Sequence, residues 1–140
     1  MKTYFDSSVL IAALVKGENA HDAALAQFLS SDEKFTCAHA IAETFSTLTG
    51  GRMPVRFSPA QAREIITSGI KSRFSIVELS AADYFDAMGE SEMVGARGGA
   101  IYDVLHLRAA KAISADRVLT LNVSHFSTFA RGANLAIEPP

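Results

Sequence analysis

The 140-residue sequence contains a single cysteine, Cys37. One cysteine cannot form an internal disulfide, and no Cys/His spacing resembles a zinc site. Cys37 lies in an apolar run over 35–38, where we expect it to be a small buried core residue. Hydrophobic residues make up 49% of the chain, enough for a core without covalent cross-links. These features favour a reducing, cytosolic setting.

A long uninterrupted apolar run is also lacking. Asp6 interrupts the apolar N-terminal stretch, and the polar segment 16–19 soon follows, unlike a signal peptide. No segment approaches the roughly 20 apolar residues of a membrane span. We therefore expect a soluble, cytoplasmic protein with no membrane partner.

Positive charge is not in excess, since 13 Lys and Arg face 15 Asp and Glu and the net charge is −2. A protein that merely coats nucleic acid is usually basic, so the balance argues against a histone-like binder. It leaves room for an RNA-cutting enzyme, because a site built from carboxylates is acidic until a metal ion fills it.

Strand-like and helix-like patterns alternate, without repeats, low-complexity tracts or linkers. We therefore predict one domain over 1–140, of the α/β class, with a mainly parallel sheet. The predicted strands are 2–5, 35–37, 74–79, 117–121 and a short terminal one near 135–137. The predicted helices are 9–15, 20–29, 39–49, 59–68, 81–92 and 100–113.

The predicted helix starts differ in their capping residues. Ser7 or Ser8 is expected to cap the first helix and Asn19 the second. Ser58, followed by Pro59 and Gln61, predicts a capping box. The helix over 39–49 carries apolar residues at helical spacing, which predicts a buried face. Those residues are Ile41, Phe45 and Leu48.

Two polar residues follow predicted strands directly. Asp6 ends the first strand and Asn122 ends the strand over 117–121. Ligands bind beyond the carboxyl ends of strands in open α/β sheets, so the two side chains would meet if these strands are neighbours. Each residue alone also has an ordinary role, because Asp6 can cap a helix and Asn122 can shape a turn.

Two further acids lie near helix starts among apolar neighbours, Glu43 and Asp103. A carboxylate that is partly out of water needs a partner, and a divalent cation is one. Alone, Glu43 fits a solvated helix residue and Asp103 fits a favourable interaction with the helix dipole. If these acids converge, two carboxylates about 4 Å apart repel by about 4 kcal/mol, so protons or a cation must bind. Mg²⁺ prefers such oxygen ligands.

At these residues the chain resembles the PIN-domain family, specifically the VapC-type toxin ribonucleases of toxin–antitoxin pairs. The resemblance rests on four segments in order, which together cover nearly the whole chain. They are Phe5-Asp6-Ser7-Ser8, Ala42-Glu43, the segment Ile101–Leu107 with Tyr102-Asp103, and Leu119–Phe126 with Thr120 and Asn122.

The resemblance implies a three-layer α/β/α fold around a parallel sheet of about four to five strands. It implies a metal site for Mg²⁺ or Mn²⁺ made by Asp6, Glu43 and Asp103. Asn122 takes the fourth position, where many relatives carry Asp, which favours one metal or one tight and one weak. Ser8 and Thr120 fall where relatives place hydroxyl groups near the metal. A homodimer and a VapB-like antitoxin partner are also implied.

Several other residues have both a possible functional role and an ordinary structural one. His106, one turn beyond Asp103, can serve as a general base or ligand, or pack within its helix. Arg52 and Arg97, beside glycines, are candidate contacts to RNA phosphates, as is Arg108; solvated surface charge is the alternative for each.

The leading hypothesis is therefore a metal-dependent endoribonuclease that hydrolyses tRNA, rRNA or mRNA, as the toxin of a pair that inhibits translation. The alternative is a non-catalytic PIN-fold module that grips a basic partner through its acidic groove. A receiver-like phosphotransfer domain is disfavoured, because only one acid follows the first strand.

Overall fold

The computed structural model describes residues 1–51 and 53–140. The prediction that Arg52 contacts RNA therefore lies outside the described residues. Five strands form one sheet in the order β3-β2-β1-β4-β5, and every neighbouring pair is parallel. The strands are β1 Lys2–Phe5, β2 Glu33–Cys37, β3 Ser75–Val77, β4 Arg117–Leu119 and β5 Ala136–Glu138.

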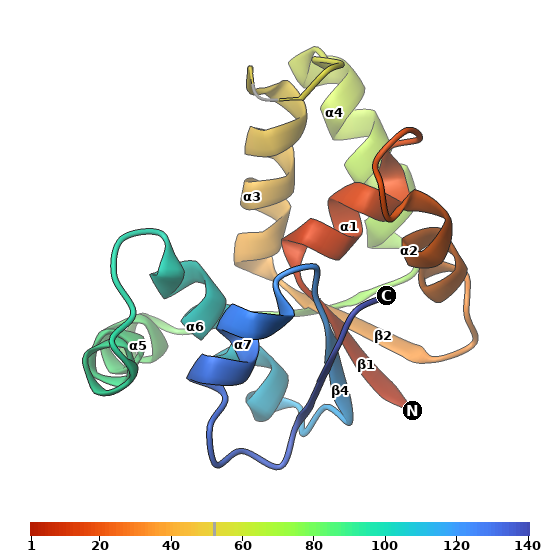
Figure 1. The fold of residues 1–140 in the computed structure, drawn as a ribbon. Helices are drawn as coiled ribbons and strands as arrows, with labels where there is room; N and C mark the ends of the chain where they lie inside the picture. The colour runs from red at the N-terminus through yellow and green to blue at the C-terminus, as the bar shows by residue number, and fades with distance from the viewer. Residues whose placement is uncertain (52) are drawn as a thin grey trace.

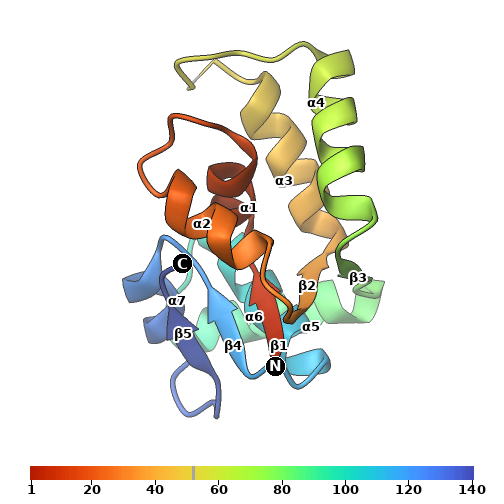
Figure 2. The same cartoon turned by 90° about the vertical axis from the view of Figure 1, so that its right-hand side faces the viewer.

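Helices cover both faces of this sheet, which confirms the three-layer prediction (Figure 1). Helices α5, α6 and α7 lie on one face, whereas α1 and α2 lie on the other. Helices α3 and α4 pack against each other and rise beyond the sheet (Figure 2). The helices are α1 Ser7–Leu14, α2 His21–Phe28, α3 Ala38–Thr49, α4 Pro59–Ile66, the π-helix η1 Thr67–Lys71, α5 Ala81–Val94, α6 Ala100–Ala112 and α7 Val123–Phe129.

The central strand β1 is the centre of the core. Its last residues, Tyr4 and Phe5, are completely buried, as are Val118 and Leu119 of the adjacent β4. Strands buried on both faces read as continuous apolar runs, which is why 117–121 was predictable as a strand. Cys37, at the end of β2, is also buried, as the sequence predicted.

The helix caps follow the sequence in one case and differ in two. Ser58 forms the predicted capping box with Gln61. Helix α1 is capped by Asp6, whose carboxylate accepts a hydrogen bond from the Val9 backbone N–H. This confirms the capping role considered for Asp6, and the expectation for Ser7 or Ser8 was wrong. The prediction for Asn19 was also wrong, because α2 begins after Ala20 without a side-chain cap.

Two apolar residues of α3 that were predicted to be buried in the core are exposed. Ile41 and Phe45 are 36% and 37% exposed, whereas Leu48 is fully buried. Helix α3 extends beyond the sheet, so one side of it faces α4 across a shallow groove rather than the core. Helix α7, the next element after β4, was not predicted from the sequence.

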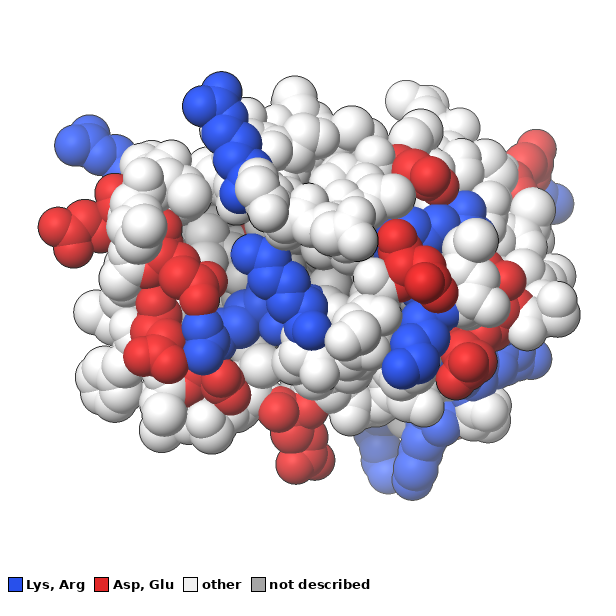
Figure 3. All heavy atoms as spheres, turned by 90° about the horizontal axis from the view of Figure 1, so that it is seen from below, with Lys and Arg blue, Asp and Glu red and all other residues white. Residues whose placement is uncertain are grey.

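No helix in the described part of the chain is both long enough and apolar enough to cross a membrane. On the face seen from below in Figure 3, Lys and Arg side chains are interspersed with Asp and Glu.

Candidate active site

The candidate site lies at the carboxyl end of β1. This strand pairs with β2 on one side and β4 on the other, and the strand order reverses here: the chain runs from β1 to β2 and β3 on one side and then crosses to β4 and β5 on the other. Such a switch point leaves a crevice between the connections, where open α/β sheets bind ligands. Asp6 is the first residue after β1, and its backbone N–H donates to the carbonyl of Leu119 in β4.

The Asp6 carboxylate is held by three donors and is only 4% exposed. The Ser8 hydroxyl donates to Oδ1 at 2.6 Å and the Thr120 hydroxyl donates to Oδ2 at 2.7 Å. The third donor is the Val9 backbone N–H, at 3.1 Å. The two hydroxyl residues that the resemblance singled out therefore contact Asp6 directly, one on each carboxylate oxygen.

Glu43 reaches the same region from α3. The Ser7 hydroxyl, next to Asp6 in the chain, donates to Glu43 Oε2 at 3.3 Å. His106 Nε2 donates to Oε1 at 2.7 Å. Burial by itself raises the pKa of Glu43, but the hydrogen bond and charge of His106 outweigh it and hold that pKa below its usual value. Glu43 is thus ionised and oriented by a residue from α6.

His106 is buried behind Glu43, with 1% of its surface exposed. Its Nδ1 shares a hydrogen bond with the Tyr4 hydroxyl at 2.7 Å and lies 3.7 Å from the Cys37 sulfur. Burial lowers the pKa of His106, but the contacts with Cys37 and Glu43 outweigh it and raise the pKa to about 10. Both ring nitrogens are therefore engaged, and the imidazole is fixed between β1 and α3.

Asp103 lies in the first turn of α6, one turn before His106, and the ionised form of its carboxyl is disfavoured. Burial is the largest cause that raises its pKa to about 6. The charges of Asp6 and Glu43 add to this effect, whereas those of His106 and His125 oppose it. The folded chain thus brings Asp103 within electrostatic range of both other acids.

The three acids are linked through their neighbours rather than in direct contact. Ser7 joins the Asp6 segment to Glu43, and His106 joins Glu43 to the helix that carries Asp103. Within the described residues, no three His, Cys, Asp or Glu side chains are close enough together to hold a metal ion as they stand. Glu43 Oε1 accepts a hydrogen bond from His106.

The donor set nevertheless fits a hard divalent cation. It consists of carboxylate oxygens, the ligands that Mg²⁺ prefers. Burial, together with the charges of Asp6 and Glu43, disfavours the ionised form of Asp103, and a bound cation would favour it. The residues that would hold the ion are Asp6, Glu43 and Asp103.

Asn122 lies beside this set. Its backbone N–H donates to the Thr120 hydroxyl at 3.0 Å, and its side chain shares a hydrogen bond with His125 at 2.9 Å. The two strands are neighbours, as the prediction required, but Asn122 is connected to Asp6 through its backbone N–H and Thr120, whereas its side chain bonds to His125.

The candidate RNA contacts differ in their surroundings. Arg97 is exposed between α5 and α6. Arg108, by contrast, forms salt bridges with three acids of α5, so the idea that it meets RNA phosphates is not supported: its charge is already compensated within the protein. These acids are Asp83, Asp86 and Glu90.

Known proteins resemble this chain in sequence and in fold. The sequence matches the PIN domain over residues 3–131. The chain belongs to the PIN-domain family. It is 31% identical over 105 residues to ribonuclease VapC27 of Mycobacterium tuberculosis, a match that covers 75% of this chain and 74% of that protein. The chain is therefore a member of the VapC-like PIN ribonucleases.

Solved structures share its fold at lower identity. Mycobacterium tuberculosis VapC20, a toxin that cleaves the sarcin–ricin loop, is 15% identical with a TM-score of 0.69, over 83% of this chain and 86% of that chain. Rickettsia felis VapBC2, bound to promoter DNA, is 20% identical with a TM-score of 0.69, over 100% and 99%. FitAcB of Neisseria gonorrhoeae is 17% identical with a TM-score of 0.63, over 99% and 97%.

Sequence reasoning missed the residues that support the acids. These residues contact Glu43 or His106 and are Tyr4, Ser7 and Cys37. From the sequence, Tyr4 was expected only as a strand residue, Ser7 as a possible helix cap and Cys37 as a buried core residue. Only the position of His106, one turn beyond Asp103, gave a signal, because it places both side chains on one side of α6.

Proposed function

We propose that this PIN domain is a Mg²⁺- or Mn²⁺-dependent endoribonuclease that works as a single nuclease domain over 1–140. The observation that supports the proposal is the chain of contacts from the carboxyl end of β1 to α3 and α6: the Ser7 hydroxyl, next to Asp6, donates to Glu43, and Glu43 accepts from His106, one turn beyond Asp103. The similarity to ribonuclease VapC27 supports RNA as the substrate.

Asp6, Glu43 and Asp103 would hold the cation. When bound, it would polarise the phosphate and lower the pKa of an attacking water. Because Ser8 and Thr120 fix both Asp6 oxygens, this carboxylate is oriented before the cation or substrate arrives. Preorganisation of this kind lowers the cost of binding.

The two remaining acids would have different tasks. His106 keeps Glu43 ionised and directs Oε1, so Glu43 must share that oxygen or use Oε2 to reach the cation. Asp103, whose pKa is raised to about 6, releases its proton near neutral pH and gains the most from a positive partner. Asn122 adds a neutral oxygen, and a neutral group favours one metal, or one tight and one weak, over two equal sites.

In the cell, we propose that the chain is the toxin of a toxin–antitoxin pair that inhibits translation by cutting tRNA, rRNA or mRNA. Similarity to the VapBC complexes supports a VapB-like antitoxin as its partner. By analogy with this family, the active form would be a cytoplasmic homodimer, with the antitoxin covering the acidic crevice.

The test is cleavage of RNA by Asp6→Asn. Asparagine keeps an oxygen for the Val9 N–H, so α1 should remain capped while a metal ligand is lost. We expect Mn²⁺-dependent cleavage by the unchanged protein and a loss of about a hundredfold or more in the variant. The matched control is Asp22→Asn, an exposed acid of α2, which should cleave normally.

Full Mn²⁺-dependent activity in a folded Asp6→Asn protein would contradict the proposal. Mn²⁺ should also raise the melting temperature of the unchanged protein by mass action. A protein that cuts no RNA and gains no stability from Mn²⁺ would instead support the non-catalytic binding module.

A further inference from the structure

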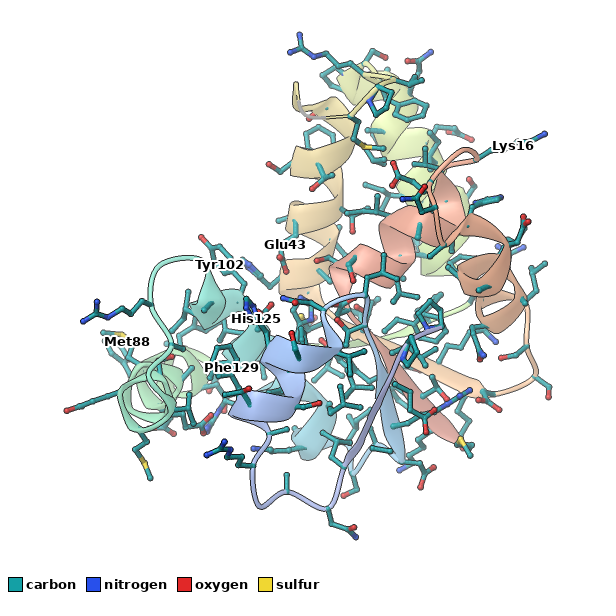
Figure 4. The ribbon with its side chains drawn as sticks, in the orientation of Figure 1. Lys16, Glu43, Met88, Tyr102, His125 and Phe129 are labelled. Carbon is teal, nitrogen blue, oxygen red and sulfur yellow. The ribbon has the colours of Figure 1, made fainter. Side chains whose placement is uncertain are left out.

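A hollow of about 380 Å³ opens directly beside Glu43, between α3 and the start of α6. Its size lies at the small end of the range for ligand pockets, about 300–1,000 Å³. In Figure 4, Glu43 on the lower part of α3 and Tyr102 at the start of α6 are close together, and His125 of α7 lies below them. The lining residues are His39, Ala42, Glu43, Ser46, Thr47 and Tyr102.

Two aromatic rings form one wall of this hollow. The rings of His39 and Tyr102 stack with their centroids 4.7 Å apart and their planes inclined by 26°. Tyr102 remains 44% exposed in spite of this contact. His39 therefore supports the tyrosine ring from within the protein, while much of the ring is open to a ligand.

Tyr102 is fixed relative to the acidic residues by the chain itself. It immediately precedes Asp103 in the first turn of α6, and His39 lies one helical turn before Glu43 in α3, with 3.6 Å between His39 Nε2 and Glu43 Oε1. The aromatic wall thus comes from the same two helix segments that carry two of the proposed metal ligands.

We propose that the Tyr102–His39 stack is a subsite for one unpaired nucleobase of the RNA, next to the bond that is cut; this inference rests on the proposed nuclease function. Stacking of bases on aromatic side chains is how proteins commonly hold single-stranded RNA. The site takes the base of a splayed nucleotide, whose own phosphate then lies toward Asp103.

The chemistry of the hollow favours a neutral flat ring over an anionic group. No Lys or Arg is among the described residues that line it, so the hollow offers no cationic side chain to pair with a phosphate. A base carries no charge there, and its edge meets the hydroxyl groups of Ser46 and Thr47, which both donate and accept hydrogen bonds. A paired base is stacked within its duplex, so the subsite selects unpaired regions.

The experiment measures RNA binding without cleavage, in the Asp6→Asn protein with Mn²⁺ present. The probe is a short single-stranded RNA with 2-aminopurine, whose fluorescence is quenched by stacking. Tyr102→Leu should weaken binding by about 5- to 150-fold, the range for losing one stacked base. Tyr102→Phe keeps the ring and should bind within about twofold of the parent. Phe85→Ala, which removes an exposed aromatic ring of α5, is the matched control and should change nothing.

Equal binding and equal quenching by Tyr102→Leu and Tyr102→Phe would overturn the subsite. Should Tyr102→Leu fail to fold, RNA with 5-iodouracil and the Asp6→Asn protein decide: a photocrosslink to Tyr102 is expected, and crosslinks only elsewhere would overturn the subsite. The nuclease proposal fails separately, if the unchanged protein cuts no RNA with Mn²⁺ although its binding still depends on Tyr102.

Discussion

Neutralising Asp103 should stabilise the metal-free protein, although it should destroy its activity. The pKa of this carboxyl is raised to about 6, mainly by burial. The folded protein therefore holds the Asp103 proton more tightly than the unfolded chain does. The resulting stability is fully present below the unfolded value of 3.8 and is lost as the pH rises through about 6. At pH 8 the ionised carboxylate opposes folding.

The size of the effect follows from the shift. A pKa that rises from 3.8 to about 6 corresponds to about 3 kcal/mol, at 1.36 kcal/mol for each factor of ten in proton affinity. Asp103 is only partly buried, so solvent screening reduces this figure to about 1–2 kcal/mol. Asp103→Asn should gain this amount at pH 8, or about 2–8 °C in melting temperature for a chain of this length.

Urea unfolding in EDTA at pH 8 and pH 4 is the assay. The variant should be more stable than the unchanged protein at pH 8 and nearly equal to it at pH 4. Added Mn²⁺ should reverse the order at pH 8, because only the intact site gains stability from the ion. The matched control is Asp83→Asn. The Ser80 backbone N–H and the Arg108 guanidinium hold the pKa of Asp83 below its usual value, so this variant should lose stability at pH 8.

A variant that is less stable than the unchanged protein at pH 8 without metal would refute this reasoning. So would a gain of the same size at both pH values, since it could not arise from the charge of Asp103.

Two further predictions concern the residues around the site. Tyr4→Phe removes the hydroxyl that lies 2.7 Å from His106 Nδ1 and leaves only the Cys37 sulfur, 3.7 Å away, beside this nitrogen. Urea unfolding should therefore show a free energy of unfolding that is lower by about 1–3 kcal/mol. An unchanged midpoint would mean that the buried hydrogen bond contributes nothing to stability. Arg108→Met leaves three carboxylates of α5 without their shared cation, so stability should fall in low salt and recover partly in about 1 M salt; a loss that does not depend on salt would point to packing instead.

The strands and most helices were predictable because their signals are local. The run over 117–121 is largely apolar because β4 is covered on both faces. Ser58, Pro59 and Gln61 all lie within the first turn of α4, where they cap the helix, so a short segment of sequence carries the whole signal. Helix α7 has no such signal. Its sequence is rich in Ser, Thr and β-branched residues, which are weak helix formers, and burial of Phe126 against the core stabilises it instead.

The acids of the proposed site were easier to propose from the sequence than the contacts that support them. Asp6 follows a buried strand, and Glu43 and Asp103 stand out among apolar neighbours. That His106 orients Glu43, 63 residues away, depends on α6 packing next to α3, and no local pattern encodes this arrangement. The exposure of Ile41 and Phe45 has the same origin, because the periodicity of α3 does not reveal where the sheet ends.

The most direct measurement is the anomalous scattering of Mn²⁺ in crystals of the protein. We expect one strong peak bounded by the carboxylates of Asp6, Glu43 and Asp103, with Glu43 turned partly away from His106, and no peak there in Asp6→Asn crystals. A Mn²⁺ peak elsewhere on the molecule, with none at these carboxylates under conditions that support cleavage, would contradict this expectation.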